Sequence, residues 1–116
     1  MARIVVANPN TLMEQKVYFT FTTGTLVLQA VAANSVITGA WLSINTAFNG
    51  VAPGIQFGIT AAPGMILNNG EVNLALVDKY GLPELVEFTQ ADILLLTIVS
   101  SGSTQGAGTL VYQYRS

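Results

Sequence analysis

The strongest constraint on the fold is a two-residue period of apolar side chains that recurs in separate segments. In residues 17–22, VYFTFT, one face is Val-Phe-Phe, and residues 42–46 and 55–60 alternate in the same way. A period of two is typical of a β-strand that buries one face. No segment has both the length and the 3.6-residue period of an amphipathic helix. We therefore predict a single core that contains Phe19, Phe21, Leu42, Ile44, Phe57 and Ile59.

Turn-forming residues separate these segments. Gly, Pro, Asn and Ser gather in residues 22–25, 48–54, 61–65, 68–70 and 100–108. About eight short strands divided by such turns predict an all-β fold, a single-domain antiparallel β-sandwich of the jelly-roll or immunoglobulin-like kind. We expect this domain to span residues 11–116 and to follow an N-terminal arm, residues 1–10.

Four local expectations accompany this fold. TTGT, residues 22–25, predicts a hairpin between the strands on either side of it. The missing side chain at Gly58 predicts a β-bulge or the close approach of another backbone. AAPGM, residues 61–65, is expected to be a turn. The next turn signal is NNG, residues 68–70, which precedes the segment EVNLALV, residues 71–77. Residues 78–92 hold half of the charged side chains of the chain, so we expect a solvated edge there.

Charge is the anomaly in the composition. Charged residues make up 9% of the chain, against about 25% in typical soluble domains. Between Lys16 and Glu71 there is none, and Thr, Ser, Asn and Gln take their place. Such a surface suits a protein that packs against its own copies or a larger assembly, where an unpaired charge is costly to desolvate. The alternative is a β-sandwich that is simply rich in threonine.

The residue types argue against an enzyme. The chain has no His and no Cys, which excludes Ser-His-Asp and Cys-His nucleophiles and zinc sites built on cysteine. A pair of carboxylates could still cleave glycosides, and the candidates are Glu84 and Glu87, with Asp92, Asp78 and Glu71 nearby. We interpret them instead as the solvated edge. No calcium-binding spacing and no phosphate-binding loop occurs, so neither a metal nor another cofactor is expected.

Membranes and nucleic acids are also poor candidates as partners. The apolar run ILLLTIV, residues 93–99, is far shorter than the roughly 18 to 20 residues of a membrane-spanning helix. The beginning of the chain, MARIVVANPN, does not have the pattern of a signal peptide. The four basic residues are too few and too scattered to follow a phosphate backbone: Arg3, Lys16, Lys79 and Arg115.

The aromatic residues are the candidates for binding. Trp41, Tyr18, Tyr112 and Tyr114 could form a platform that stacks against sugars or a contact surface for protein. Trp41 lies between two apolar neighbours, and we expect it in the core. Tyr112 and Tyr114 share one face of the last strand, and we expect them at an interface. The same interface is predicted to include the apolar run of the arm: Ile4, Val5 and Val6.

A longer stretch resembles a known class of proteins. Residues Ala40 to Thr60, AWLSINTAFNGVAPGIQFGIT, combine an alternating strand that ends in Thr-Ala-Phe-Asn-Gly with a short loop and a strand that contains an apolar-Gly-apolar step. The stretch resembles parts of small β-rich virion proteins of tailed bacteriophages, which include capsid decoration or cement proteins and related head and tail components. The resemblance implies a structural, non-enzymatic role in a multimeric particle.

The composition and the resemblance together predict a decoration protein of the virion. It would associate with itself as a homotrimer, bind the major capsid protein and stabilise the capsid lattice by bridging its subunits. The alternative is a glycan-binding module of a tail fibre or a lectin-like protein. Exposed aromatic residues beside acidic or amide groups would favour that alternative, and apolar patches with buried termini would favour the decoration protein. A small hydrolase is a third alternative.

Overall fold

A computed structural model describes residues 12–82 and 85–115 of the chain. In this part of the chain the regular elements are all strands, so the all-β prediction is confirmed. The nine strands are β1 (Leu12–Thr20), β2 (Thr25–Val31), β3 (Val36–Thr46), β4 (Gly54–Ile59), β5 (Ala62–Leu67), β6 (Lys79–Leu82), β7 (Val86–Glu87), β8 (Asp92–Val99) and β9 (Ala107–Arg115).

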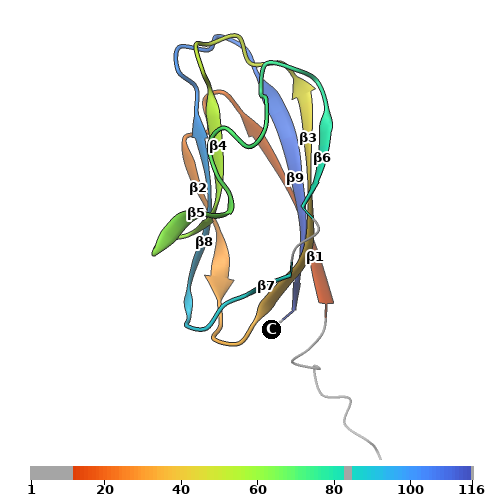
Figure 1. The fold of residues 1–116 in the computed structure, drawn as a ribbon, viewed down its shortest axis with the longest axis vertical. Coiled ribbons are helices and arrows are strands. Elements are labelled where there is room, and N and C mark those ends of the chain that lie inside the picture. Colours follow the sequence, from red (N-terminus) through yellow and green to blue (C-terminus); the bar gives the residue numbers. More distant parts are fainter. Residues whose placement is uncertain (1–11, 83–84, 116) are drawn as a thin grey trace, which may run out of the picture.

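The strands form two antiparallel sheets that face each other as a sandwich (Figure 1). The first, here called sheet A, has the order β1-β9-β3-β6, and β7 also pairs with β3. The second, sheet B, has the order β2-β8-β4-β5. The strands β9 and β3 are therefore central in sheet A, and β8 and β4 are central in sheet B.

The pairing of the strands distinguishes the two sandwiches that the sequence left open. β1 pairs with β9, β2 with β8, β3 with β6 and β7, and β4 with β5. The chain is thus a long antiparallel hairpin, nested around the turn between β4 and β5. Pairs between β3 and β9 and between β4 and β8 roll this hairpin into two sheets. This nesting is a jelly roll.

The predicted hairpin around TTGT is wrong. β1 pairs with β9 in sheet A, whereas β2 pairs with β8 in sheet B. The N–H of Thr23 donates to the carbonyl oxygen of Thr20, and Gly24 has a φ of 67°, which glycine adopts without steric cost. The turn therefore carries the chain from one sheet to the other. Turn-forming residues indicate a change of direction but not the sheet in which the next strand pairs.

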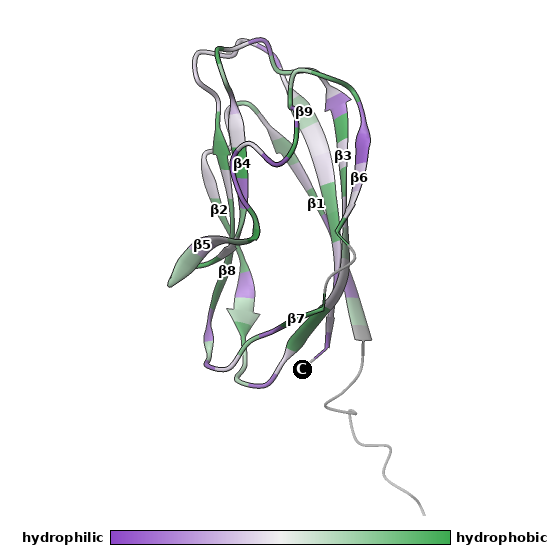
Figure 2. Ribbon diagram, in the orientation of Figure 1, coloured by the Kyte–Doolittle hydropathy of each residue, from purple (hydrophilic) through white to green (hydrophobic). Residues whose placement is uncertain are grey.

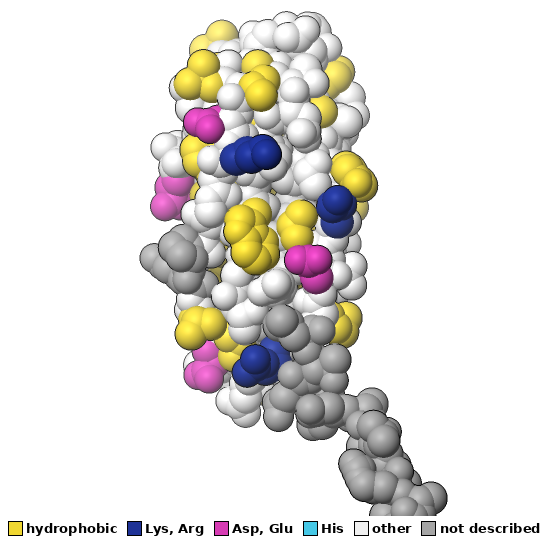
Figure 3. Space-filling view, turned by 90° about the vertical axis from the view of Figure 1, so that its right-hand side faces the viewer, with side chains coloured by type: hydrophobic (Ala, Val, Ile, Leu, Met, Phe, Trp, Pro, Cys, Tyr) yellow, Lys and Arg dark blue, Asp and Glu magenta, His cyan; other side chains and the backbone are white. Residues whose placement is uncertain are grey.

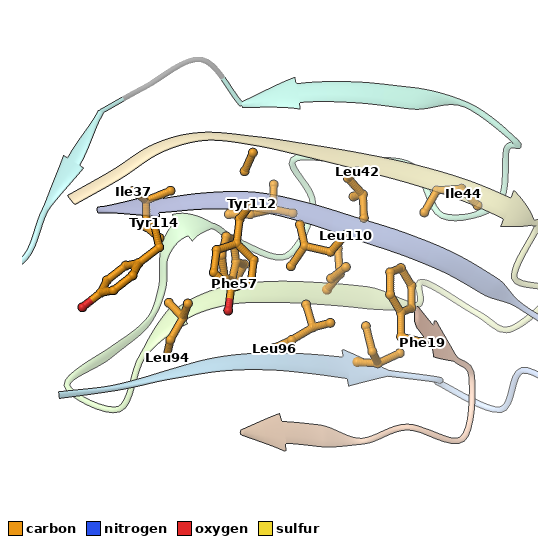
Figure 4. Packing of buried hydrophobic residues seen from close by; sticks show 14 of the residues in the cluster. Phe19, Ile37, Leu42, Ile44, Phe57, Leu94, Leu96, Leu110, Tyr112 and Tyr114 are labelled. Carbon is orange, nitrogen blue, oxygen red and sulfur yellow. The ribbon is translucent and has the colours of Figure 1, made fainter. Parts of the chain in front are cut away.

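The core lies between the two sheets (Figure 4). Phe19, Leu42, Ile44 and Phe57 are at most 2% exposed, and Phe21 and Ile59 pack against them, so the predicted core set is confirmed. The residues of sheet A point toward those of sheet B in Figure 4, where Leu42, Leu110 and Tyr112 face Phe57, Leu94 and Leu96. In the described part of the chain, every buried side-chain nitrogen or oxygen atom has a hydrogen-bond partner.

The prediction that Trp41 lies in the core is wrong, because its side chain is 46% exposed. Leu42 and Ile44 of the same strand are buried, and the period of two then places Trp41 on the outer face of sheet A. The apolar neighbours of a residue in the sequence do not bury it when they point to the other side of the strand. The exposure of Trp41 makes it a candidate binding residue.

The region around β5 differs in part from the prediction. AAPGM was expected to be a turn, but β5 begins at Ala62 and pairs with β4. The close approach at Gly58 is confirmed, since the register shifts there and a Cβ atom would lie 2.6 Å from the carbonyl oxygen of Pro63. Residues 71–78, which include EVNLALV, form an irregular connection of turns and bends between β5 and β6.

Candidate interaction surfaces

Charged side chains are distributed unequally between the two sheets. The strands of sheet B contain one, Asp92, at the first position of β8. The described strands of sheet A carry Glu14, Lys16, Lys79, Glu87 and Arg115. In Figure 2, the first part of β6 at the edge of sheet A has the hydrophilic colour, and β5 at the edge of sheet B has mostly the hydrophobic one. The two outer faces of the sandwich therefore differ in kind.

The outer face of sheet B is uncharged, with apolar side chains on either side of a neutral polar row formed by Thr25, Thr97 and Gln56. Residues of β8 that alternate with its buried leucines point outward, among them Ile93 and Leu95. Val27 lies opposite Leu95, and Ala30 lies opposite Ile93. Val27 is 63% exposed and Val99 is 40% exposed. An exposed apolar patch of this kind is typical of a surface that packs against another protein.

The outer face of sheet A combines an aromatic centre with charges around it. Trp41 on β3 lies opposite Val111 on β9 and, on its other side, opposite Gly81 on β6. Val111 in turn lies opposite Lys16 on β1. Figure 3 shows hydrophobic side chains in the middle of this face and both basic and acidic side chains near them. Tyr18 on β1 is also exposed, at 71%, so this face combines exposed aromatic side chains with charged ones.

A shallow groove of about 210 Å³ opens beside the indole ring. It is lined by Thr38, Gly39, Ala40, Trp41, Gly81, Leu82 and Gln113. A Cβ atom at Gly81 would meet no atom within 4 Å, so the space over this residue is open, whereas one at Gly39 would touch the indole at 3.4 Å. The Thr38 hydroxyl donates a hydrogen bond of 3.4 Å to Oε1 of Gln113. The groove therefore has an aromatic wall, a floor without side chains at Gly81 and a neutral polar rim.

Tyr112 and Tyr114 lie in the core, so the prediction that they supply exposed contact area is wrong. They are 1% and 5% exposed. The Tyr112 hydroxyl donates to Oε1 of Gln29 at 2.6 Å, and the Tyr114 hydroxyl accepts from the N–H of Ala32 at 3.1 Å. These bonds connect β9 of sheet A with β2 and the residue after it. Burial raises the pKa of Tyr112 to about 12, and Tyr114 beside it adds to this shift.

The inward position of Gln29 is a feature that the sequence analysis missed. Regular alternation of Leu26 and Leu28 with Val27 and Gln29 would place Gln29 on the outer face. The register of β2 against β8 shifts between Val27 and Gln29, and this bulge reverses the faces of the strand, since an extra residue changes the alternation by one. No sequence signal marks the bulge.

The remaining predicted site residues do not converge. Ile4, Val5, Val6 and Glu84 lie outside the described residues. Glu87 belongs to β7 in sheet A, whereas Asp92 belongs to β8 in sheet B. Among the residues that the structure describes, no three His, Cys, Asp or Glu side chains gather as a metal site would require. Nor does any helix in this part of the chain have the length and apolar character to cross a membrane.

The carboxylate of Asp92 connects two segments of the chain through hydrogen bonds. It accepts hydrogen bonds from the Thr60 hydroxyl, the N–H of Ile93 and the N–H of Ala61. These bonds, the one from Thr60 first, lower the pKa of Asp92. A carboxylate held in its ionised form by neighbouring donors fastens the β4–β5 turn to the start of β8.

Comparisons with known proteins agree with this architecture. No family model and no curated protein matches the sequence. Among solved structures, a chain in the acidic stable capsid structure of Helicobacter pylori bacteriophage KHP30 matches with a TM-score of 0.67 and 16% identity, over 92% of this chain and 90% of that one. A chain in the capsid asymmetric unit of cyanophage Pam1 matches with a TM-score of 0.66 and 11% identity, over 98% of this chain and 93% of that one.

The chain shares its fold with these two phage capsid chains. At identities this low the likeness concerns the fold alone. It nevertheless confirms, at that level, the resemblance to bacteriophage virion proteins that was stated on residues 40–60.

Proposed function

We propose that this chain is a structural subunit of a bacteriophage virion, a decoration protein that binds the capsid lattice through the outer face of sheet B. The observation that carries the proposal is the near absence of charge from the described strands of that sheet, combined with the exposure of Val27 and Val99. The fold that the chain shares with chains of two phage capsid structures supports it.

The mechanism of such a protein is cementing. Apolar surface removed from water contributes about 25 cal/mol per Å², and a surface without charges avoids the cost of burying an unpaired ion. A subunit that contacts two neighbouring capsid subunits at once binds only their assembled arrangement. It therefore stabilises the lattice by mass action, as any ligand specific for one state does. This role requires no catalytic group and no cofactor.

The partners in this proposal are the major capsid protein and other copies of this chain, arranged as a homotrimer. β1 is at the edge of sheet A, and edge strands invite pairing with another chain. The arm that precedes β1 contains Ile4, Val5 and Val6, which a monomer gains little by exposing. In our proposal these three residues are buried against a neighbouring copy.

Two threonines provide a matched test of the docking face. Thr97 on β8 and Thr109 on β9 are both half-buried, both in central strands, and on the outer faces of opposite sheets. Either is replaced by Lys, and binding to capsid shells of the same phage that lack this protein is measured by cosedimentation. Thr97→Lys should lose binding, because it places a charge in the neutral face, whereas Thr109→Lys should keep it, because that face already carries charges.

Circular dichroism and urea unfolding establish that both variants are folded. Equal occupancy of the two variants on the shells would refute the assignment of the docking face. Absence of binding by the unaltered protein would refute the decoration function itself. The sedimentation velocity of the free protein tests the trimer separately, since a monomer at all concentrations would contradict it.

A further inference from the structure

We propose that the groove beside Trp41 is a saccharide-binding site, which takes one pyranose ring against the indole. Sugars present an apolar C–H face that packs on aromatic rings, and tryptophan offers the largest such ring. The indole is 46% exposed, and the open space over Gly81 lies directly across the strand pair from it. A ring placed there would contact the indole without displacing any side chain.

The polar groups of the groove fit a neutral ligand with hydroxyl groups. Oε1 of Gln113 already accepts a bond from the Thr38 hydroxyl. In the described part of the chain no hydrogen bond uses Nε2 of Gln113, so this amide can donate to a sugar oxygen. None of the lining residues is charged. An apolar wall with a few oriented polar groups is the usual composition of a small-molecule site.

The size of the groove limits the ligand. Its volume of about 210 Å³ lies below the range of about 300 to 1,000 Å³ that holds drug-sized molecules, so one ring fits rather than a large cofactor.

This site is on the sheet opposite the proposed docking face. It would stay accessible while the protein is bound to a particle, and it does not depend on the decoration function. A protein bound to a surface through sheet B would present the site on sheet A to the surroundings. Binding of the isolated protein to sugars therefore tests the inference by itself.

The single tryptophan of the chain makes the test specific. Intrinsic fluorescence of the full-length protein is titrated with cellotriose and with triacetylchitotriose, and with mannitol as an acyclic polyol control. We expect a saturable change of the emission with at least one of the two cyclic probes and none with mannitol. Calorimetry with the same probe gives the affinity independently of the fluorophore.

Two variants locate the binding. Gly81→Val fills the open space, and we expect it to weaken binding at least about tenfold, which corresponds to about 1.4 kcal/mol. Gln113→Ala tests the polar rim without adding volume and serves if the valine variant does not fold. Val51→Thr, in the exposed connection between β3 and β4, is the control and should bind as the unaltered protein does.

Three results would overturn the inference. The first is the lack of a saturable response to either cyclic probe up to its solubility limit. The second is unchanged affinity in folded Gly81→Val and Gln113→Ala. The third is an emission change that follows protein concentration without sugar, because the groove would then be filled by a second copy of the chain.

Discussion

Replacement of Tyr112 tests whether this residue belongs to the core or to an interface. Tyr112→Phe removes only the hydroxyl that donates to Gln29 at 2.6 Å. A neutral hydrogen bond contributes about 0.5 to 1.5 kcal/mol to stability. Because Gln29 is half-buried, water can partly replace the lost donor, so we expect a loss of about 1 kcal/mol or less.

Tyr112→Ala removes the ring as well. The ring is 1% exposed and lies 5.7 Å from that of Phe57, centroid to centroid, at an interplanar angle of 48°. Truncation of a buried aromatic side chain to alanine costs about 3 to 5 kcal/mol, and the aromatic pair accounts for about 0.5 to 1.5 kcal/mol of interaction beyond area burial. The free energy of unfolding should therefore fall by about 3 to 5 kcal/mol.

The assay is urea unfolding followed by the fluorescence of Trp41, together with capsid binding under conditions in which each variant is folded. We expect both variants to lose stability and to keep capsid binding once folded. A surface tyrosine would behave in the opposite way. A loss below about 0.5 kcal/mol for Tyr112→Ala, with weaker binding, would show that the ring is on the surface and that our assignment of the core is wrong.

Alkaline pH provides an independent check on the same residue. The pKa of Tyr112 is about 12 in the folded chain, against 10.0 for the ordinary group. Between these pH values the unfolded chain has lost the phenolic proton and the folded chain still holds it, so stability falls as the pH rises from about 10 to about 12. Tyr112→Phe should lack this part of the alkaline decrease. Parallel pH profiles of the two proteins would contradict the buried, neutral phenol.

Three further predictions use the same unfolding and binding measurements. Gly108→Ala should lower the free energy of unfolding by about 1 to 3 kcal/mol, because a Cβ atom there would overlap the Phe19 ring and lie 2.6 Å from a carbonyl oxygen of β3. Gly81→Ala, where the space is open, should change it by less than about 0.5 kcal/mol. Asp92→Asn should remove a contribution to stability that the unaltered protein has above pH 3.8 and loses as the pH falls through the lowered pKa of Asp92 in the folded chain. Equal acid profiles would contradict it. Deletion of residues 2–8 should leave the sandwich folded and weaken assembly or capsid binding, and unchanged oligomer size with unchanged capsid occupancy would refute the role of the arm.

The sequence predicted the faces of the strands better than their partners. Alternation placed Leu42 and Ile44 in the core, and both are buried. The same rule would have placed Trp41 on the outer face, but the apolar residues on either side of it, Ala40 and Leu42, outweighed the rule in our interpretation. Tyr112 is the opposite case, because we expected it at an interface and it is buried. The tendency of tyrosine to occur at interfaces outweighed its position on the same face of β9 as Leu110. Where residue type and alternation disagreed, alternation was right in both cases.

The pairing of strands could not be read from the sequence, because it depends on contacts between distant segments. β1 and β9 are the first and last strands of the described chain, yet they are neighbours in sheet A. TTGT favours a turn whether the chain continues in the same sheet or crosses to the other. The bulge between Val27 and Gln29 has no glycine or proline to mark it. The candidate groove depends on both kinds of information, since Trp41, Gly81 and Gln113 come from three strands.

The absence of charge between Lys16 and Glu71 corresponds to a definite part of the structure. This stretch forms β2, β4 and β5, three of the four strands of sheet B, and β3, a central strand of sheet A. Charges enter sheet A through β1, β6, β7 and β9. A composition that only avoided charge would leave both outer faces equally neutral. The concentration of neutral surface on one sheet is what a docking face requires, and the pair of threonine variants measures this difference directly.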